Sequence, residues 1–405
     1  ATMAIYTKEE ARKILEKALS FSKADTCEIN LNGSNSGNIR YARNTVSTSG
    51  YSSNQSLAVQ SSFGKKSGTA TIDEFDDASL EKVVRRAEEL ANLSPENPEF
   101  MEPLGPQIYD ESISFSEATA NITPEYRAKV ASSGIVPAAA QDVTAAGFFN
   151  DSAGFSAMIN SKGLFAYNKS TNTDFTVTMR TNDGTGSGWV SRDFNDVTKF
   201  DADEASKTAI DKAVLSREAK AIEPGKYTVI LEPAAASDLL RNMFRSLDAR
   251  SADEGRSFMS AADGANKLGQ KIVDERVNIW SDPLNSEVPT SPWNYAGQPL
   301  KKTTWLENGV VKNLAYDRFW AKEKGVEPVP YPSNVIMAGG DQSLEDLIKG
   351  TKKGILVTRL WYIRSVDPQT LLYTGLTRDG TFYIENGQIK YPVKNFRFNE
   401  SPIIM

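Results

Sequence analysis

The sequence contains no histidine among its 405 residues. Histidine is the commonest metal ligand in proteins and the usual general base near neutral pH. Its absence excludes Ser-His-Asp and Cys-His catalysis within this chain, together with every zinc site of the HExxH type. What remains is carboxylate, lysine, tyrosine or serine chemistry, an oxygen-ligated magnesium or calcium site, or no chemistry at all.

Cysteine is almost as scarce, since Cys27 is the only one in the chain. A single cysteine excludes an internal disulfide and a thiolate-rich zinc site, and says little about the compartment. No apolar run approaches the ~20 residues of a membrane helix, and no signal-peptide core is present. We therefore expect a cytoplasmic protein without a membrane partner, and leave open a leader that has been removed.

The chain also lacks an excess of positive charge. Its formal net charge is -6, so no general attraction to nucleic acid or anionic lipid is expected. With 40% hydrophobic and 24% charged residues, the composition is that of an ordinary soluble globular protein. The length suffices for two or three domains of about 150 residues each.

The first half of the sequence alternates helical and extended patterns. A capping box of Thr7 and Glu10 opens a first helix, and Thr123-Pro124 opens a later one. Residues 56–72 indicate two strands around a turn at 64–66. Gly, Asn and Ser separate four further extended segments in the manner of an antiparallel meander: 145–151, 154–160, 163–170 and 173–184. We predict an N-terminal α+β domain, residues 1–220, with an antiparallel sheet and helices.

The second half is mostly antiparallel β in its pattern. Asn308-Gly309 and Asn386-Gly387 each lie between alternating apolar segments, which is the strongest short-range signal of a hairpin. Asp379-Gly380 predicts another turn. We expect a β-rich C-terminal domain, residues 221–405, that is barrel-like or sandwich-like and follows a short linker at Lys220–Lys226.

Arginine and aromatic residues are concentrated between residues 358 and 401. Arginine beside exposed aromatic rings is typical of an interface core or a peptide groove. The alternative is that these arginines cap hairpin carbonyls and stack on rings at the sheet surface, and both interpretations stay open. The candidate peptide or partner surface consists of Arg359, Trp361, Arg364, Tyr373, Arg378 and Tyr383.

A strand-to-helix junction lies near the start of the second half. The extended stretch 227–231 is followed by Pro233, which suits a first helical position, and then by an amphipathic run. Such a junction can carry a catalytic helix. Its polar positions are nevertheless poor metal ligands and poor general bases: Arg241, Asn242, Arg245 and Ser246.

Two segments in this half, "VILEPAAASDLL" (229–240) and "WLENGVVKNLAYDRFWAKEKG" (305–325), resemble the TldD/PmbA family, once called modulators of DNA gyrase and also described as peptidase U62-like. The resemblance covers most of the chain and is densest from Gly225 to Ser401. It implies an α+β N-terminal domain and a β-rich C-terminal domain. It also implies a two-subunit metalloprotease that degrades unfolded peptides and trims leader segments of peptide antibiotics.

Within that family, the catalytic branch carries HExxxH after a pair of leucines. Here Leu239-Leu240 are followed by "RNMFRS", so Arg241 and Ser246 stand at the histidine positions and Asn242 at the glutamate position. Arginine has no lone pair for a metal, serine is a poor zinc ligand, and asparagine cannot take a proton from bound water. The chain therefore resembles the PmbA/TldE-type subunit, with no catalytic residue and no metal ligand of its own.

Three functions stay open from the sequence. The first is a non-catalytic subunit, in a homodimer or with a TldD-type partner that holds the zinc, acting on unfolded peptides. The second is a self-sufficient hydrolase with carboxylate or serine chemistry, and the third is a homo-oligomeric peptide-binding protein.

The catalytic branch of the family takes a further cysteine ligand from near its C-terminus, and the present sequence stops at Met405, before the usual family end.

Overall fold

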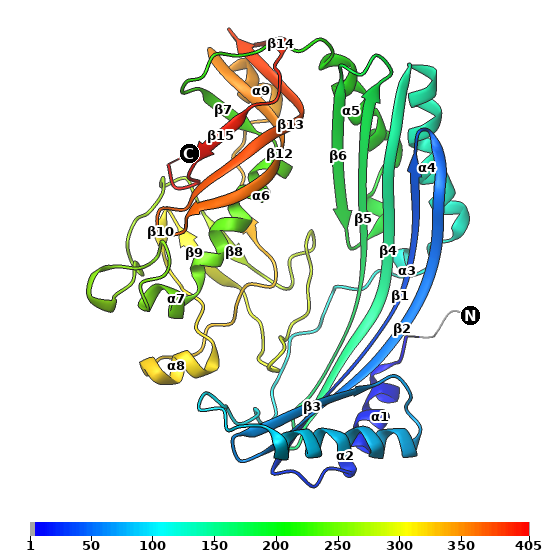
Figure 1. Cartoon of the computed structure of the whole chain (residues 1–405), viewed down its shortest axis with the longest axis vertical. Coiled ribbons are helices and arrows are strands. Elements are labelled where there is room, and N and C mark those ends of the chain that lie inside the picture. The colour runs from blue at the N-terminus through cyan, green and yellow to red at the C-terminus, as the bar shows by residue number, and fades with distance from the viewer. Residues whose placement is uncertain (1–4, 405) are drawn as a thin grey trace.

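The structure is a computed structural model that describes residues 5–404. In Figure 1 a long curved sheet from the first half of the chain faces a β-rich region from the second half. None of the helices in the described range has the combination of length and apolarity that a membrane span requires.

The first half is built on one antiparallel sheet of six strands, in the order β3-β2-β1-β4-β5-β6. The turn predicted at residues 64–66 is confirmed, because β2 ends at Phe63 and β3 begins at Lys66. The strands are β1 Thr26–Ala42, β2 Thr45–Phe63, β3 Lys66–Ile72, β4 Val143–Asn160, β5 Phe165–Thr181 and β6 Ser187–Phe194.

The four short segments of the predicted meander form only two long strands. Residues 145–151 and 154–160 both belong to β4, and 165–170 and 173–181 both belong to β5. The polar stretch around Asp151 does not turn, because Asp151 pairs with Gly37 of β1 on one side and with Thr173 of β5 on the other. Pairing on both edges thus outweighs the local turn preference of Asn, Asp and Gly.

Helices cover one face of this sheet. The predicted capping box is present, since Thr7 accepts from the Glu10 amide and the Glu10 side chain accepts from the Thr7 amide. One buried cluster joins α1 and α2 to the sheet, and a second joins α4 and α5 to it. The helices of the first half are α1 Lys8–Ser20, α2 Asp77–Leu93, α3 Glu117–Ala120, α4 Pro124–Ala140 and α5 Ala202–Leu215, with a 3-10 turn at Val197–Lys199.

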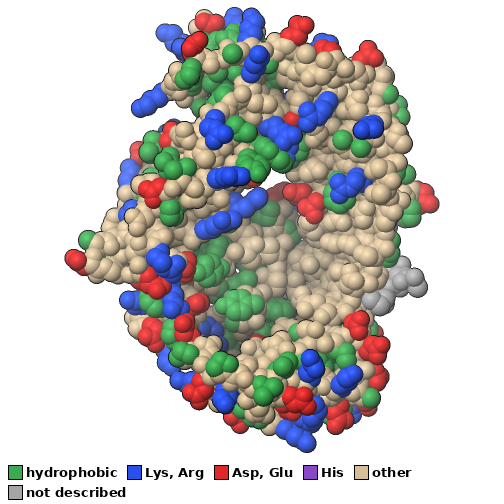
Figure 2. Space-filling model, viewed as in Figure 1, with side chains coloured by type: hydrophobic (Ala, Val, Ile, Leu, Met, Phe, Trp, Pro, Cys, Tyr) green, Lys and Arg blue, Asp and Glu red, His purple; other side chains and the backbone are tan. Residues whose placement is uncertain are grey.

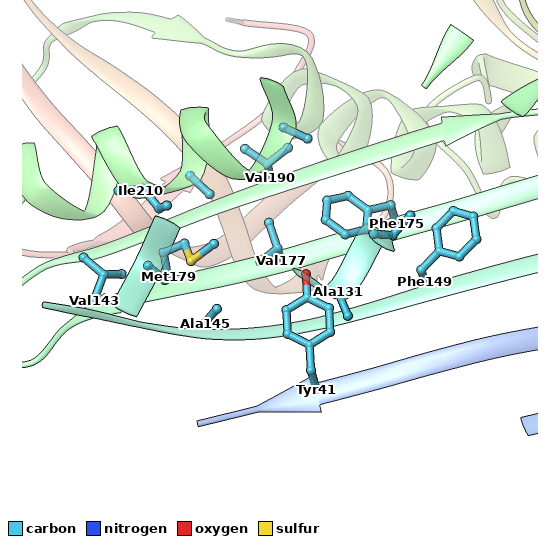
Figure 3. Packing of buried hydrophobic residues seen from close by; sticks show 14 of the residues in the cluster. Tyr41, Ala131, Val143, Ala145, Phe149, Phe175, Val177, Met179, Val190 and Ile210 are labelled. Atoms are coloured by element: carbon cyan, nitrogen blue, oxygen red, sulfur yellow. The ribbon is translucent and has the colours of Figure 1, made fainter. Parts of the chain in front are cut away.

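The core under α4 and α5 shows why the sheet has two different faces. Phe149, Phe175 and Val177 are fully buried, and Figure 3 shows them projecting from neighbouring strands among the other labelled apolar side chains. Successive residues of a strand point to opposite faces. The residues between them, such as Asn150 and Thr176, therefore point to the face without helices.

One ion pair is buried on the covered face. Arg127 of α4 donates from Nε and Nη2 to the two carboxylate oxygens of Asp151 on β4, at 2.7 and 3.0 Å. Both side chains are less than 10% exposed. Gly37 of β1 leaves room for the guanidinium, since a Cβ at that position would lie 2.0 Å from Arg127 Nη2.

The second half contains two open sheets, which the β-rich expectation anticipated, and the described strands do not close into a barrel. In the larger sheet, β7 runs parallel to β12, while the other pairs are antiparallel. Its strands are β7 Thr228–Leu231, β12 Lys353–Asp367, β13 Leu372–Glu385, β14 Gln388–Pro392 and β15 Arg397–Glu400. The smaller sheet contains β8 Ile279–Ser281, β9 Thr303–Glu307, β10 Val310–Val311 and β11 Ile336–Met337.

Short helices accompany these sheets. The helix predicted after the first strand is α6, and the boundary near residue 220 falls between α5 and β7, although the division into two folding units stays a prediction. The helical segments of the second half are α6 Pro233–Phe244, α7 Ala249–Asp253, α8 Arg318–Lys324 and α9 Leu344–Lys349, with 3-10 turns at Arg245–Leu247 and Ala262–Gly264.

Two of the three tight turns predicted in the second half are confirmed. Asn308-Gly309 and Asn386-Gly387 join their strands with φ of 50° and 77° in each pair, as a two-residue hairpin turn requires. The prediction at Asp379-Gly380 is wrong, because both residues lie inside β13. There they form a bulge: Val357 pairs with Thr381 but Arg359 pairs with Arg378, so β13 has one extra residue.

Candidate functional site

The helix α6 is held from both halves of the molecule. Ala235 and Leu239 are buried in one cluster with Ile355 and Val357 of β12. At the start of the helix, Glu232 forms an ion pair with Lys212 of α5, and both side chains are less than a fifth exposed. These contacts fix the position of α6 relative to the larger sheet of the second half and also relative to the first half of the chain.

The side chains of the three residues predicted to be degenerate motif positions, on α6 and in the turn after it, have separate surroundings. The Arg241 side chain is 76% exposed, and its nearest carboxylate is that of Asp238, at 3.8 Å. Asn242 donates from Nδ2 to the backbone oxygen of Asp238 at 2.8 Å. Ser246 is buried in the 3-10 turn after the helix.

This donor set does not fit a zinc ion. An exposed guanidinium, an amide bonded to the backbone and a buried hydroxyl offer no set of lone pairs directed at one point. Within residues 5–404, no group of three or more Asp, Glu or Cys side chains lies close enough together to hold a metal ion.

The structure brings together three of the six residues of the predicted Arg-aromatic surface. Arg359 pairs with Arg378 across β12 and β13, and Trp361 lies between them. Their guanidinium carbons lie over the Trp361 ring, 4.7 Å from its centroid for Arg359 and 4.4 Å for Arg378. Trp361 is still 38% exposed, so this stack forms part of the surface.

Arg359 also connects this stack to the six-stranded sheet. It forms an ion pair of 3.0 Å with the buried Asp379 and lies 4.2 Å from the centroid of Trp189 on β6. Ser187, also on β6, donates a hydrogen bond to Asp379. The bulge at Asp379-Gly380, which the sequence predicted to be a turn, therefore places the Asp379 carboxylate where the two halves of the chain meet.

The other three residues of the predicted surface lie elsewhere. Tyr373 is buried and donates to the backbone oxygen of Asn242 at 3.2 Å, which fixes the end of α6. Tyr383 stacks on Tyr391 of β14 with the ring centroids 5.0 Å apart. Arg364 is exposed near the other end of β12. The six residues thus do not form one continuous patch.

The face of the six-stranded sheet without helices lines a hollow between the two halves, which Figure 2 shows near the centre of the molecule. Its side chains are mostly small and polar. A shallow depression of about 310 Å³ on this face is lined largely by such residues. Those facing it include Asn32, Ser34, Asn54, Ser56, Ser152, Ser156 and Ser170.

Two carboxylates on this face were missed in the sequence. Asp174 of β5 and Asp193 of β6 are direct cross-strand partners, and Asn172 donates to Asp174 at 3.0 Å. Partial burial, with a hydrogen bond and the negative charge from Asp174, raises the pKa of Asp193 to about 7, although Arg241 of α6 lowers it. The alternation around Phe175 could have placed Asp174 on this face, but only the strand register brings Asp193 beside it.

The geometry described so far defines a class: an α+β protein in which a long antiparallel sheet, covered by helices on one face, faces a β-rich C-terminal region across a hollow. Three family models match in order along the chain. They describe PmbA/TldA metallopeptidase domain 1 at residues 27–91, the central domain at 102–217 and the C-terminal domain at 224–405. The chain belongs to the PmbA/TldD metallopeptidase family.

Individual relatives agree with this assignment. The crystal structure of TldE from Thermococcus kodakarensis has a TM-score of 0.87 at 19% identity, over 97% of this chain and 92% of that one, and shows the same fold. An uncharacterized protein of Methanocaldococcus jannaschii is 31% identical over 161 residues, or 36% of this chain. A protein named metalloprotease from Methanothermobacter thermautotrophicus is 24% identical over 264 residues, or 59% of this chain. These matches span 37% and 56% of the lengths of the two relatives.

Proposed function

We propose that this chain is the subunit without a metal motif in a TldD/TldE-type metalloprotease, and that it takes part in processing or degrading unfolded peptides. In this proposal the chain has no catalytic residue and no metal ligand, and zinc belongs to a TldD-type partner. The expected assembly is a dimer, either of two copies or with that partner, in the cytoplasm.

The observation that carries the proposal is the donor set on α6. The helix is anchored to both halves of the molecule, so its orientation does not depend on a metal. The positions where a catalytic relative would hold zinc are an exposed arginine, a backbone-bonded asparagine and a buried serine. A cation beside these positions would meet the positive charge of Arg241.

The decisive experiment mixes the purified chain with a TldD-type metalloprotease that retains its histidines, and adds an unfolded peptide. We expect the two chains to co-elute from a sizing column and the rate of peptide hydrolysis to rise on mixing. Unchanged hydrolysis without co-elution would contradict the proposal.

The metal content gives an independent test. We expect less than stoichiometric zinc by elemental analysis of the purified chain, because its α6 residues offer no ligand set. About one tightly bound zinc per chain, lost together with activity on chelation, would overturn the assignment of the metal to a partner.

A second candidate function is supported by one observation. Asp174 and Asp193 are direct cross-strand partners, and burial together with the negative charge of Asp174 raises the pKa of Asp193 to about 7, where a carboxyl group can act as acid or base. This observation favours a hydrolase that acts alone. Peptide hydrolysis by the unmixed chain, abolished by Asp174→Asn but not by Arg241→Gln, would support this candidate over the first.

A further inference from the structure

A separate pocket of about 330 Å³ lies where the six-stranded sheet, the segment before α3 and α8 meet. The sheet contributes Glu28, Gln60 and Ser62 to its lining, the connecting segment contributes Phe100, and the second half of the chain contributes Arg318. This volume falls within the range of small-molecule sites in proteins. None of these residues belongs to the motif positions on α6 or to the Arg-aromatic surface.

Two opposite charges face this pocket, and they interact electrostatically without forming a direct ion pair with each other. Glu28 is half-buried on β1, and among the described residues its carboxylate has no hydrogen bond or ion pair. Arg318 is half-buried at the start of α8 and donates to the backbone oxygen of Glu102 at 2.7 Å, but it forms no ion pair within the described chain. Burial raises the pKa of Glu28, and the charge of Arg318 partly counters that rise.

The other charged groups in the lining are already engaged within the protein. Glu99 forms an ion pair with Arg250, and Asp317 accepts a hydrogen bond from the backbone of Trp320 at 2.7 Å to cap α8. Lone half-buried charges are costly unless a partner compensates them. Glu28 and Arg318 therefore are the two groups in this pocket with capacity left for a ligand.

The remaining lining is apolar or neutral. Phe100, Met101 and Phe319 supply apolar surface, and Gln60 lies directly across the strand pair from Glu28. A ligand that suits this arrangement has a cation at one end, an anion at the other, and an apolar group between or beside them. Free α-amino acids and dipeptides have this chemistry.

We propose that this pocket binds a zwitterionic amino acid or dipeptide, with its ammonium group at Glu28 and its carboxylate at Arg318. The site needs neither a metal nor a partner subunit, so it does not rest on the function proposed above. Charge-assisted hydrogen bonds at both ends give the specificity, and Arg318 suits the carboxylate because its guanidinium can present two parallel donors.

Isothermal titration calorimetry on the full chain tests this proposal with four probes. L-leucine and L-alanyl-L-leucine distinguish an amino acid from a dipeptide as the ligand. N-acetyl-L-alanyl-L-leucine lacks the ammonium group, and L-alanyl-L-leucinamide lacks the carboxylate. We expect at least one free zwitterion to bind, and each blocked dipeptide to bind about ten-fold more weakly than the free one, or worse, if the dipeptide is the ligand. For an amino-acid ligand, N-acetyl-L-leucine and L-leucinamide replace the blocked dipeptides.

Variants assign each end of the ligand to its residue. The Glu28→Gln variant should bind the free zwitterion about ten-fold more weakly than the unmodified chain does, and should bind the N-acetylated form as well as the unmodified chain does. It should still bind the amide more weakly than the free zwitterion. Arg318→Gln should show the reverse pattern. Glu345→Gln and Arg86→Gln, both at exposed positions outside the pocket, are the matched controls and should bind like the unmodified chain.

Two results would overturn the proposal. One is that neither L-leucine nor L-alanyl-L-leucine gives a saturable heat of binding. The other is equal weakening of all probes by Glu28→Gln, which would indicate a change in pocket shape. If thermal unfolding shows that Arg318→Gln does not fold, Arg318→Lys takes its place. That variant keeps the charge but loses the two-donor fork, so it should weaken the free form more than the amide.

Discussion

The two faces of the six-stranded sheet carry side chains of opposite kinds. The face under the helices is apolar, with Phe149, Phe175 and Val177 fully buried. The opposite face is rich in neutral polar residues, such as Asn32, Ser152 and Ser170. Because the side-chain period of a strand is two, one sequence pattern specifies both faces at once. The comparison shows which face stabilises the fold and which is left to face the hollow.

Each face also contains a pair of charges whose relation to its surroundings differs from that of the other pair. The apolar face contains the complementary pair Arg127–Asp151, which is buried and bonded at both oxygens. The polar face contains the like-charged pair Asp174–Asp193, which lies at the hollow. An attractive pair in the interior and a repulsive pair at the surface should respond oppositely to mutation, so they test the comparison directly.

The largest expected effect is the loss of the buried ion pair. Arg127→Ala leaves the Asp151 carboxylate buried without its partner, so we expect the free energy of unfolding to fall by about 3–5 kcal/mol. Urea unfolding followed by circular dichroism measures this change. The control is the double variant Arg127→Met with Asp151→Leu, which removes both charges and should recover most of the loss. A single-variant loss below about 1 kcal/mol would mean that water reaches Asp151.

The next effect concerns the contact between the polar face and the second half of the chain. Trp361→Ala with Arg378→Ala removes the exposed part of the stack around Arg359. If this stack is a desolvated anchor for a partner, we expect the assembly to weaken by about 2 kcal/mol or more. Dissociation constants from analytical ultracentrifugation, alone and with a TldD-type subunit, measure this change.

The control for this prediction is Arg364→Ala. Arg364 lies on the same strand but is exposed beside Tyr362, away from the contact with β6. It should leave the assembly unchanged. Equal weakening by both variants would point to a general effect of charge, and no weakening by the double variant would assign the stack to the contact within the chain alone.

The sequence predicted local features of the fold better than long-range ones. The capping box at Thr7, the strand-to-helix junction at Pro233 and the two Asn-Gly turns depend on neighbouring residues, and the structure contains them. The polar stretch around Asp151 was predicted to turn because its local pattern favours one. Only pairing with strands far away in the sequence keeps it extended.

The candidate site divides in the same way. The interpretation of Arg241, Asn242 and Ser246 as degenerate motif positions came from the sequence, because a motif is a local pattern, and it stays a prediction. The ion pair of Arg359 with Asp379 depends on a bulge that the local Asp-Gly signal disguised as a turn. The Asp174–Asp193 pair and the Glu28–Arg318 pocket depend on register and on contacts between the two halves, which no single stretch of sequence specifies.

The smallest expected effect belongs to the like-charged pair and depends on pH. The pKa of Asp193 is raised in the folded chain to about 7, above its ordinary value of 3.8. A carboxyl group with a raised pKa favours the fold while it is protonated, so its contribution is complete below about pH 4 and is lost as the pH rises through 7. Above pH 7, Asp193 is ionised directly across the strands from Asp174, whose negative charge opposes that ionisation.

Asp193→Asn removes this repulsion and should therefore stabilise the chain at pH 8. Since a cross-strand pair at a surface contributes roughly 0.2–1 kcal/mol, the gain should lie in that range and should vanish near pH 4. Urea unfolding at pH 4, 6 and 8 measures it. Asp183→Asn is the matched control, because Asp183 is an exposed residue whose pKa is lowered by hydrogen bonds from Thr181 and Thr185. That variant should lose stability at pH 8 and approach the unmodified chain as the pH falls. If both variants shift stability in the same direction at pH 8, the two carboxylates on the polar face do not repel each other.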